Sequence, residues 1–277
     1  MTLATLKDVL PPCLTDGTAI AGLVVLGWED AVAFTRAAEA EGRPVILQAG
    51  PGCRAHTPLP VLGAMFRTLA ESASVPVVAH LDHGEDLATC ARAIDCGFTS
   101  VMYDGSALPL AENIARTAEI AVLAHAAGVS IEAELGVVGY AAGKPSHGTD
   151  PAEVARFVQD TGIDALAISI GNTHLMTEAR AQIDAPRLAA IEKAAPGLPL
   201  VLHGGSGLSF DLRHLLAQGT NVAKVNIGTE LRQTFGRALR DALAADPAQF
   251  DRIAILRATM GPMEQAARAA IRSLCQP

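Results

Sequence analysis

The segment VVAHLDHGED, residues 77–86, changes from apolar to ionisable within a few positions. Its first residues form a run typical of a buried strand, and its end carries Asp82 and His83. Buried strands seldom contain ionisable groups unless those groups have a partner or a function. His174 and His203 also follow apolar runs. Because three imidazoles can hold a catalytic zinc ion and leave one coordination position open, the pattern indicates a metal site with a carboxylate beside it.

The alternative for each histidine is an ordinary polar residue at a strand end. That interpretation is adequate for one histidine, but it does not explain why three of them follow three different strands beside Asp82. His80 lies one strand period before Asp82, so we expect it on the same face, lining the interior or orienting a ligand. Asp86 precedes a helical pattern and is expected to cap that helix.

Apolar runs that alternate with helical patterns must position these groups. The strand candidates are residues 20–27, 44–50, 75–82, 100–105, 130–136, 165–171, 199–205 and 222–228. Between them lie alanine-rich segments with helical spacing, such as 29–42 and 110–128, both of which end at glycine. This alternation predicts an α/β fold with a parallel sheet covered on both faces. Eight units in 277 residues favour a single (β/α)8 TIM barrel over residues 1–277, with additional C-terminal helices near 246–273; an open doubly wound sheet is the alternative.

In such a barrel the active site lies at the carboxyl ends of the strands. Polar residues there include Asp104, Glu134 and Asn226. Two glycine-rich segments, HGGSG at 203–207 and VNIGTE at 225–230, follow the seventh and eighth predicted strands. Barrels often bind phosphate at this position through glycine amides and a helix N-terminus. The pair of segments therefore predicts a site for a phosphorylated ligand.

Bulk properties exclude several function classes. The net charge is −8 and no basic cluster is present, which argues against nucleic-acid binding. No apolar stretch approaches the roughly 20 residues that a membrane span needs. Residues 1–12 look like a short amphipathic helix ended by prolines, not a signal peptide. The five cysteines are odd in number and form no CxxC pair, which is typical of reduced thiols. We therefore expect a cytoplasmic protein.

Six segments resemble class II, zinc-dependent ketose-bisphosphate aldolases, above all the tagatose- and fructose-bisphosphate aldolases. In chain order they are HLDHG, SVMYDGS, EAELG, IGNTH, LHGGSGL and KVNIGTEL. The similarity runs from about residue 44 to 240. It implies a (β/α)8 barrel that forms a homodimer or homotetramer. It also implies a lyase that reversibly cleaves a phosphorylated ketose to dihydroxyacetone phosphate, or a related ketone, and an aldehyde.

The resemblance also assigns residues. The implied ligands of one zinc ion per chain are His83, His174 and His203. Asp82 is then the catalytic acid/base, and Asp104 and Glu134 match carboxylates that hold a second or displaced metal ion. The positions implied to bind the ketone and phosphate are Gly204, Gly205, Ser206, Asn226, Ile227, Gly228 and Thr229. Relatives also bind a monovalent cation, Na⁺ or K⁺, through backbone carbonyls near the phosphate.

The chemistry of carbon–carbon cleavage fits these roles. Cleavage beside a ketone leaves a carbanion, which a zinc ion stabilises as an enediolate by acting as a Lewis acid. Asp82 would take the proton from the hydroxyl whose carbon becomes the aldehyde. A lysine Schiff base is the alternative chemistry. Lys224 is the only one of four lysines in a predicted strand, but this alternative leaves the histidines unexplained.

The sequence departs from the family pattern in a few places. After the fifth predicted strand the family has a glutamate that handles the donor's carbon-bound proton, where this chain has Tyr140, Ala141 and Ala142. Candidate replacements are Tyr140 and His147.

Three further positions are unusual. Val24 or a neighbour replaces an asparagine, Leu175 replaces a glycine, and Arg257 is a candidate contact for a distal phosphate. These changes keep two other functions open: a non-catalytic sugar-phosphate binder, and another zinc-barrel enzyme such as a hydrolase or isomerase. Against the hydrolase, the first predicted strand has no His-x-His pair.

Overall fold

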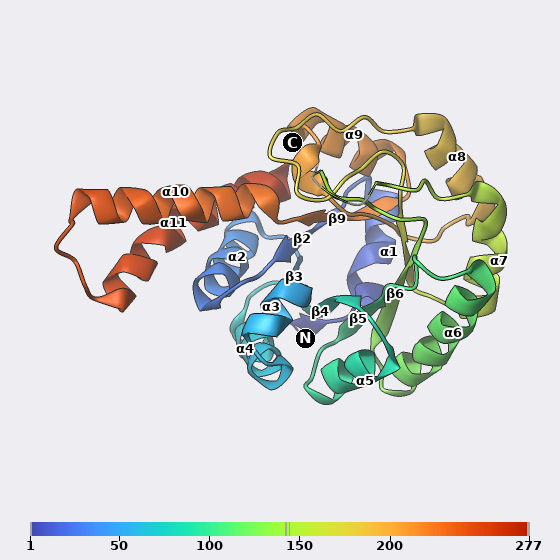
Figure 1. The fold of residues 1–277 in the computed structure, drawn as a ribbon, viewed down its shortest axis with the longest axis horizontal. Helices are drawn as coiled ribbons and strands as arrows, with labels where there is room; N and C mark the ends of the chain where they lie inside the picture. The colour runs from blue at the N-terminus through green and yellow to red at the C-terminus, as the bar shows by residue number, and fades with distance from the viewer. Residues whose placement is uncertain (1, 142, 144, 276–277) are drawn as a thin grey trace.

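The structure is a computed structural model, and it describes residues 2–141, 143 and 145–275. A closed ring of parallel strands forms its centre (Figure 1). The strands are β2 (Ile20–Val24), β3 (Val45–Ala49), β4 (Val77–Gly84), β5 (Ser100–Tyr103), β6 (Ser130–Leu135), β7 (Ala165–Ile168), β8 (Leu200–Leu202) and β9 (Val222–Ile227). Each pairs with its neighbours in chain order, and β9 pairs back with β2. The ring confirms the (β/α)8 prediction and excludes the open sheet.

Helices cover the outside of the ring (Figure 1). They are α2 (Trp28–Glu41), α3 (Pro51–His56), α4 (Leu59–Ser72), α5 (Leu87–Asp95), α6 (Leu110–Ala126), α7 (Pro151–Thr161), α8 (Ala185–Ala194) and α9 (Phe210–Gly219). The predicted stop of α2 is confirmed, since Gly42 takes φ 61°, in the left-handed region. The predicted cap of α5 is also confirmed, because Thr89 N donates to Asp86 Oδ1 at 2.7 Å.

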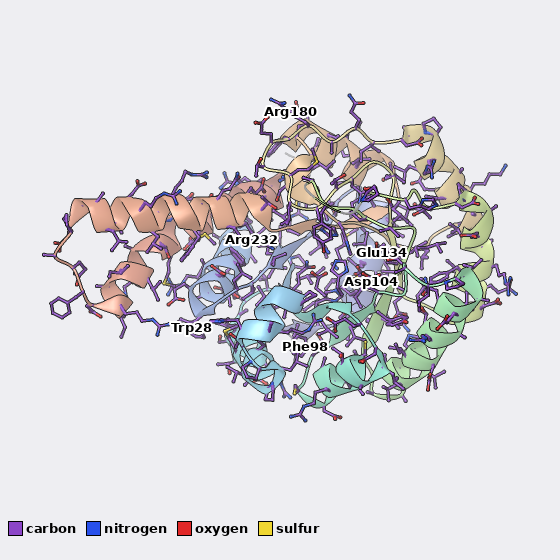
Figure 2. The ribbon with its side chains drawn as sticks, viewed as in Figure 1. Trp28, Phe98, Asp104, Glu134, Arg180 and Arg232 are labelled. Atoms are coloured by element: carbon purple, nitrogen blue, oxygen red, sulfur yellow. The ribbon has the colours of Figure 1, made fainter. Side chains whose placement is uncertain are left out.

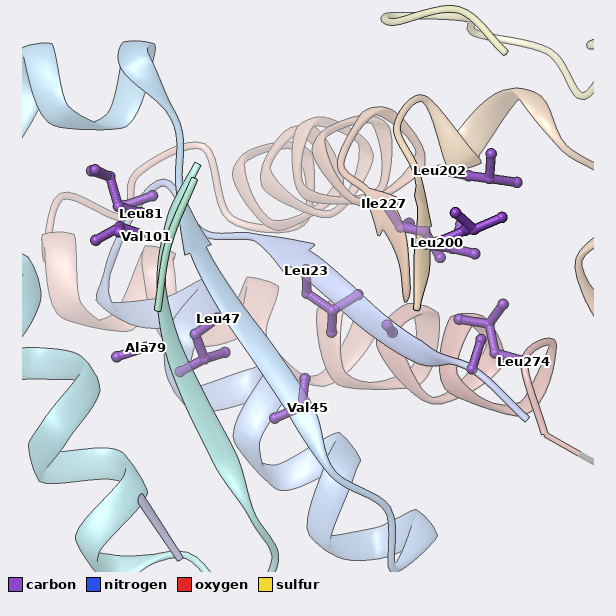
Figure 3. Close-up of a cluster of buried hydrophobic side chains, with 14 of the residues drawn as sticks. Leu23, Val45, Leu47, Ala79, Leu81, Val101, Leu200, Leu202, Ile227 and Leu274 are labelled. Atoms are coloured by element: carbon purple, nitrogen blue, oxygen red, sulfur yellow. The ribbon is translucent and has the colours of Figure 1, made fainter. Parts of the chain in front are cut away.

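Strand alternation divides the core into two layers. On β3 and β4, Leu47, Ala79 and Leu81 pack outward against the helices, as Figure 3 shows. Ile46 and Val78 belong to a separate cluster inside the ring. The same alternation directs the even-numbered polar residues of these strands inward, toward the ring interior.

The N-terminal segment differs from its prediction. Residues Leu3–Ala4 form a short strand, β1, beside β4, and α1 runs Leu6–Asp16 without ending at Pro11 and Pro12. It ends at Gly17. Both prolines lie on the exposed face, and the opposite face is fixed by burial against the ring interior. The buried residues of α1 are Leu6, Val9, Leu10 and Cys13. Packing therefore outweighs the two missing backbone donors.

Two long C-terminal helices form an arm that projects from the barrel (Figure 1). They are α10 (Thr229–Ala245) and α11 (Arg252–Arg272). The predicted helical region at 246–273 therefore begins later, at Arg252, because α10 ends at a turn near Asp246. Among the residues that the structure describes, no helix is both long and apolar enough to cross a membrane.

Candidate active site

The three predicted metal ligands meet at the carboxyl end of the barrel. His83 comes from the end of β4, while His174 and His203 follow β7 and β8. Their ring centroids lie 4.7 to 5.4 Å apart. One nitrogen from each ring lies within 4.8 Å of the others. Closure of the barrel thus brings these three histidines together, although they are far apart in the sequence.

Neighbouring carboxylates fix which ring nitrogens face this point. Asp104 Oδ2 lies 2.8 Å from His83 Nδ1, which leaves Nε2 of His83 free. Glu132 Oε1 lies 3.2 Å from His203 Nε2, which leaves Nδ1 of His203. That Nδ1 is buried and has no hydrogen-bond partner in the described part of the chain. It lies 3.4 Å from Glu134 Oε2, which is also buried without a hydrogen-bond partner among the described residues. Two such atoms facing each other are unfavourable, and a cation bound there would satisfy them, so the residues fit the expected metal.

The electrostatic environment also suits a cation. Burial, followed by repulsion from the neighbouring histidines, lowers the pKa values of His174 and His203 to about 3, so both rings are neutral at neutral pH. Burial also lowers the pKa of His83, but the charge of Asp82 and the bond to Asp104 outweigh it and raise that pKa to about 10. The negative charge that favours a proton on His83 favours a metal cation in the same way.

Asp82 lies beside the histidines and is almost completely buried. Its Oδ1 accepts a hydrogen bond from Asn226 Nδ2 at 3.3 Å. Gly50 leaves room for the other oxygen, since a Cβ there would lie 3.3 Å from Asp82 Oδ2. A cleft of about 470 Å³ opens over this group, and its lining includes Asp82, His83, His174, Ser206, Asn226 and Thr229. The structure therefore brings the predicted acid/base, two of the three predicted ligands and most of the predicted substrate contacts to one cavity. The others, His203, Gly205 and Ile227, are buried and do not belong to its described lining.

The two glycine-rich segments lie side by side at the edge of this cleft. Gly204 takes φ 66°, and a Cβ there would lie 2.2 Å from Thr173 O, so only glycine fits. Residues Gly205–Gly207 then form a 3₁₀ turn. Ser206 Oγ accepts from Glu230 N at 3.2 Å and joins this turn to the first turn of α10. The arrangement presents backbone amides and a helix N-terminus to an anion.

Asp104 and Glu134 also approach His83, and Figure 2 labels the two residues next to each other within the barrel. Glu134 Oε1 accepts from Val138 N at 3.1 Å, while Oε2 is buried and has no hydrogen-bond partner among the described residues. Burial, followed by the charge of Asp104, raises the pKa of Glu134 to about 8. A carboxylate in this state would be stabilised in its charged form by a second cation.

Lys224 is fully buried inside the barrel and does not belong to the described lining of the cleft. Its Nζ donates to Glu132 Oε2 at 2.7 Å and lies 3.2 Å from His80 Nε2. Glu132 in turn contacts His203, so the lysine holds the carboxylate that orients this predicted metal ligand. This geometry disfavours the Schiff-base alternative, because the amine is ion-paired below the site. His80 faces the interior, as expected, and is bonded to Ser100 at 2.8 Å.

Two cleft residues were missed at the sequence level. Gln48 is completely buried, and neither atom of its amide has a partner in the described ranges. A glutamine inside the apolar run PVILQAG was the available signal. Arg232 lies one turn into α10, and its Nη2 comes within 3.3 Å of where a Cβ on Gly228 would stand. Its guanidinium forms no hydrogen bond or ion pair within the described residues, and Figure 2 shows it on the side of the arm.

The departures from the family pattern also lie at the cleft. Val24 and Leu175 line it, and Leu175 takes φ 59°, a strained left-handed conformation for a leucine. The Tyr140 ring stacks on His174, with centroids 5.0 Å apart and an interplanar angle of 27°.

The remaining candidates lie elsewhere. His147 pairs through its backbone with Val137 and is not among the described lining residues, so Tyr140 is the candidate that reaches the cleft. Ala142 lies outside the described residues. Arg257 is exposed on α11 and does not belong to the described lining either.

Known proteins similar to this chain in sequence and in structure include several aldolases. The family model "Fructose-bisphosphate aldolase class-II" matches residues 4–276. The chain is 37% identical over 282 positions to a probable fructose-bisphosphate aldolase of Bacillus subtilis, covering 96% of this chain and 94% of the relative. It is 36% identical to the Geobacillus stearothermophilus fructose-bisphosphate aldolase, covering 98% and 95%. The crystal structure of the YdjI aldolase from Escherichia coli K12 superposes with a TM-score of 0.84 at 31% identity, covering 98% and 97%.

Proposed function

The chain belongs to the class II fructose-bisphosphate aldolase family, and from this premise we propose roles for the residues of the site. It is a class II ketose-bisphosphate aldolase, a carbon–carbon lyase of sugar metabolism. The family uses a divalent metal, zinc, and the histidine cluster offers a site for it. One observation carries the proposal: the ligand atoms of His83, His174 and His203 converge, and His83 and His174 line one cleft together with Asp82.

The three histidines would hold one zinc ion, which when bound supplies Lewis acidity toward the ketone oxygen of the substrate. Asp82 takes the proton from the hydroxyl whose carbon becomes the aldehyde, as the carbon–carbon bond breaks and its electrons move toward the ketone. Asn226 holds the Asp82 carboxylate through its amide. The reverse reaction returns the same proton from Asp82.

The anionic end of the substrate would lie against the glycine-rich segments. The residues proposed to bind the phosphate and ketone are Gly204, Gly205, Ser206, Asn226, Ile227, Gly228 and Thr229. Gln48 would satisfy its unpaired amide with a substrate hydroxyl. Arg213 keeps both segments in place, because it donates to Gly205 O at 3.1 Å and pairs with Glu230 at 2.8 Å.

Further features of the proposal rest on the family. Asp104 and Glu134 would hold a second or displaced metal ion, and backbone carbonyls near the phosphate would bind a monovalent cation, Na⁺ or K⁺. We propose a homodimer or homotetramer, supported by the projecting arm, where Phe250 is 93% exposed and Ile253 65%. A cytoplasmic location is supported by the five cysteines, all of which are free.

The donor half of the reaction can be tested without knowing the aldehyde. We expect dihydroxyacetone phosphate in heavy water to exchange a carbinol proton in the presence of the zinc-loaded protein, as followed by NMR. A chelator should abolish the exchange and added zinc should restore it. Zinc-loaded protein that neither exchanges this proton nor cleaves any phosphorylated ketose, yet is stabilised thermally by the compound, would instead be a sugar-phosphate binder.

Arg232 is expected to bind the substrate's anionic group. The change Arg232→Gln should raise KM about tenfold with little change in kcat, because a charge-assisted hydrogen bond of about 1.5 to 3 kcal/mol is weakened at this exposed site. The control is Arg237→Gln on the same helix, where the guanidinium contacts only Thr234 at 3.0 Å among the described residues. Steady-state kinetics measure both variants, and equal KM values would remove Arg232 from the site.

A further inference from the structure

The β4 strand contains an irregularity at its functional end. Leu81 pairs with Val101 and Gly84 pairs with Tyr103, so Asp82 and His83 together lie opposite the single residue between those partners. This is a β-bulge. His83 takes φ 50°, in the left-handed region, which is unusual for a residue other than glycine.

The bulge decides where the two side chains point. In a regular strand, successive side chains face opposite sides of the sheet. Asp82 and His83 would then be separated, one inside the barrel and one among the outer helices. The bulge inserts one extra residue and bends the strand there, so both side chains reach the same cleft. The acid/base and the first metal ligand thus depend on a local distortion.

Arg54, on α3, donates hydrogen bonds to the backbone of this bulge. Its Nη1 donates to the backbone oxygens of Asp82 and Ala49, the latter at 3.1 Å, and its Nη2 donates to the backbone oxygen of His83 at 2.9 Å. A bulge leaves backbone groups without regular ladder partners. One guanidinium therefore binds the carbonyl oxygens of both bulge residues and ties them to the end of β3.

The remaining contact of Arg54 does not explain its position. Nη2 also lies 2.8 Å from Glu85 Oε1, but the Glu85 side chain is 61% exposed, whereas that of Arg54 is 8% exposed. Exposed ion pairs contribute little to stability. The buried carbonyl contacts are therefore the main role of the side chain, and Glu85 only neutralises its outer edge.

We propose that Arg54 is a positioning residue that holds the Asp82–His83 bulge in its active geometry. This inference rests on the roles proposed above for Asp82 and His83. Arg54 does not touch the cleft itself among the described residues, so it acts through the backbone of the two residues that do. Supporting groups of this kind commonly affect metal affinity and activity as strongly as about 10- to 100-fold.

The test compares Arg54→Met, Arg54→Lys and the control Glu85→Gln. Arg54→Met keeps the packing of the stem but removes every donor, so we expect zinc affinity and kcat each to fall about 10- to 100-fold, with KM within about threefold. Arg54→Lys should recover part of both, because one ammonium can still reach a carbonyl. Glu85→Gln should stay within about twofold of the parent, since it spares the carbonyl contacts.

Two readouts separate positioning from mere stability. Cobalt substituted for zinc should show an altered visible spectrum in Arg54→Met, because the His83 ligand has moved. If both Arg54 variants melt at lower temperature yet keep the parent's zinc affinity, cobalt spectrum and kcat per bound metal, the proposal is overturned. If Arg54→Met does not fold, the Lys variant decides by the same criteria. Zinc affinity and the cobalt spectrum need no substrate, so they test Arg54 even if the aldolase assay of the parent fails.

Discussion

Replacing Asp82 with asparagine is expected to lower the rate of carbon–carbon cleavage about a thousandfold, within the range of general acid–base effects. An amide cannot take up the hydroxyl proton, but its oxygen can still accept the hydrogen bond that Asn226 donates at 3.3 Å. The variant should therefore fold and keep its zinc. Because Asp82 acts on a hydroxyl proton, exchange of the carbon-bound proton of dihydroxyacetone phosphate should persist.

The measurement combines retro-aldol kinetics, metal content and the exchange assay on the same preparation. Asp86→Asn is the matched control, since Asp86 is a nearby carboxylate whose capping role asparagine also performs. It should retain the parent's activity. Cleavage by Asp82→Asn at a rate near that of the parent would assign the acid/base role to another group. Loss of zinc along with activity would show that Asp82 supports the metal instead.

Replacing His203 with alanine is expected to remove the metal and, with it, all turnover. His203 is fully buried and its Nδ1 has no hydrogen-bond partner among the described residues, so alanine there removes one of the three nitrogens that converge on the site. Loss of orienting groups alone weakens metal binding about 10- to 100-fold, and loss of a ligand should exceed that. Zinc content after dialysis should fall well below one ion per chain, while the parent retains it.

His125→Gln is the control for this variant, because His125 lies on α6 away from the cleft and contacts Asp164 at 3.0 Å. Its zinc content and kcat should match those of the parent. Stoichiometric zinc and full activity in His203→Ala would mean that the metal is held by another set, such as His83 with Asp104 and Glu134.

The local sequence pattern was sufficient to predict the fold of this protein and the end of the barrel at which its histidines lie. Near-continuous apolar runs that alternate with segments of helical spacing predicted the barrel, because each pattern reports burial of its own segment. The carboxyl-end rule then placed His83, His174 and His203 in one site without knowledge of any distance. The prolines of α1 misled the same reasoning, since Pro11 and Pro12 are tolerated on an exposed face when the opposite face is buried.

Only the tertiary structure decided how the site works. The bulge at His83 breaks the period of two, so no periodic pattern could reveal that Asp82 and His83 face the same cleft. The orientation of each ring depends on partners far along the chain, such as Glu132, which is 71 residues from His203. The contacts of Arg54 join α3 to the ends of β3 and β4, which no local pattern shows. Sequence determines which groups reach a strand end, whereas closure of the barrel determines which groups meet there.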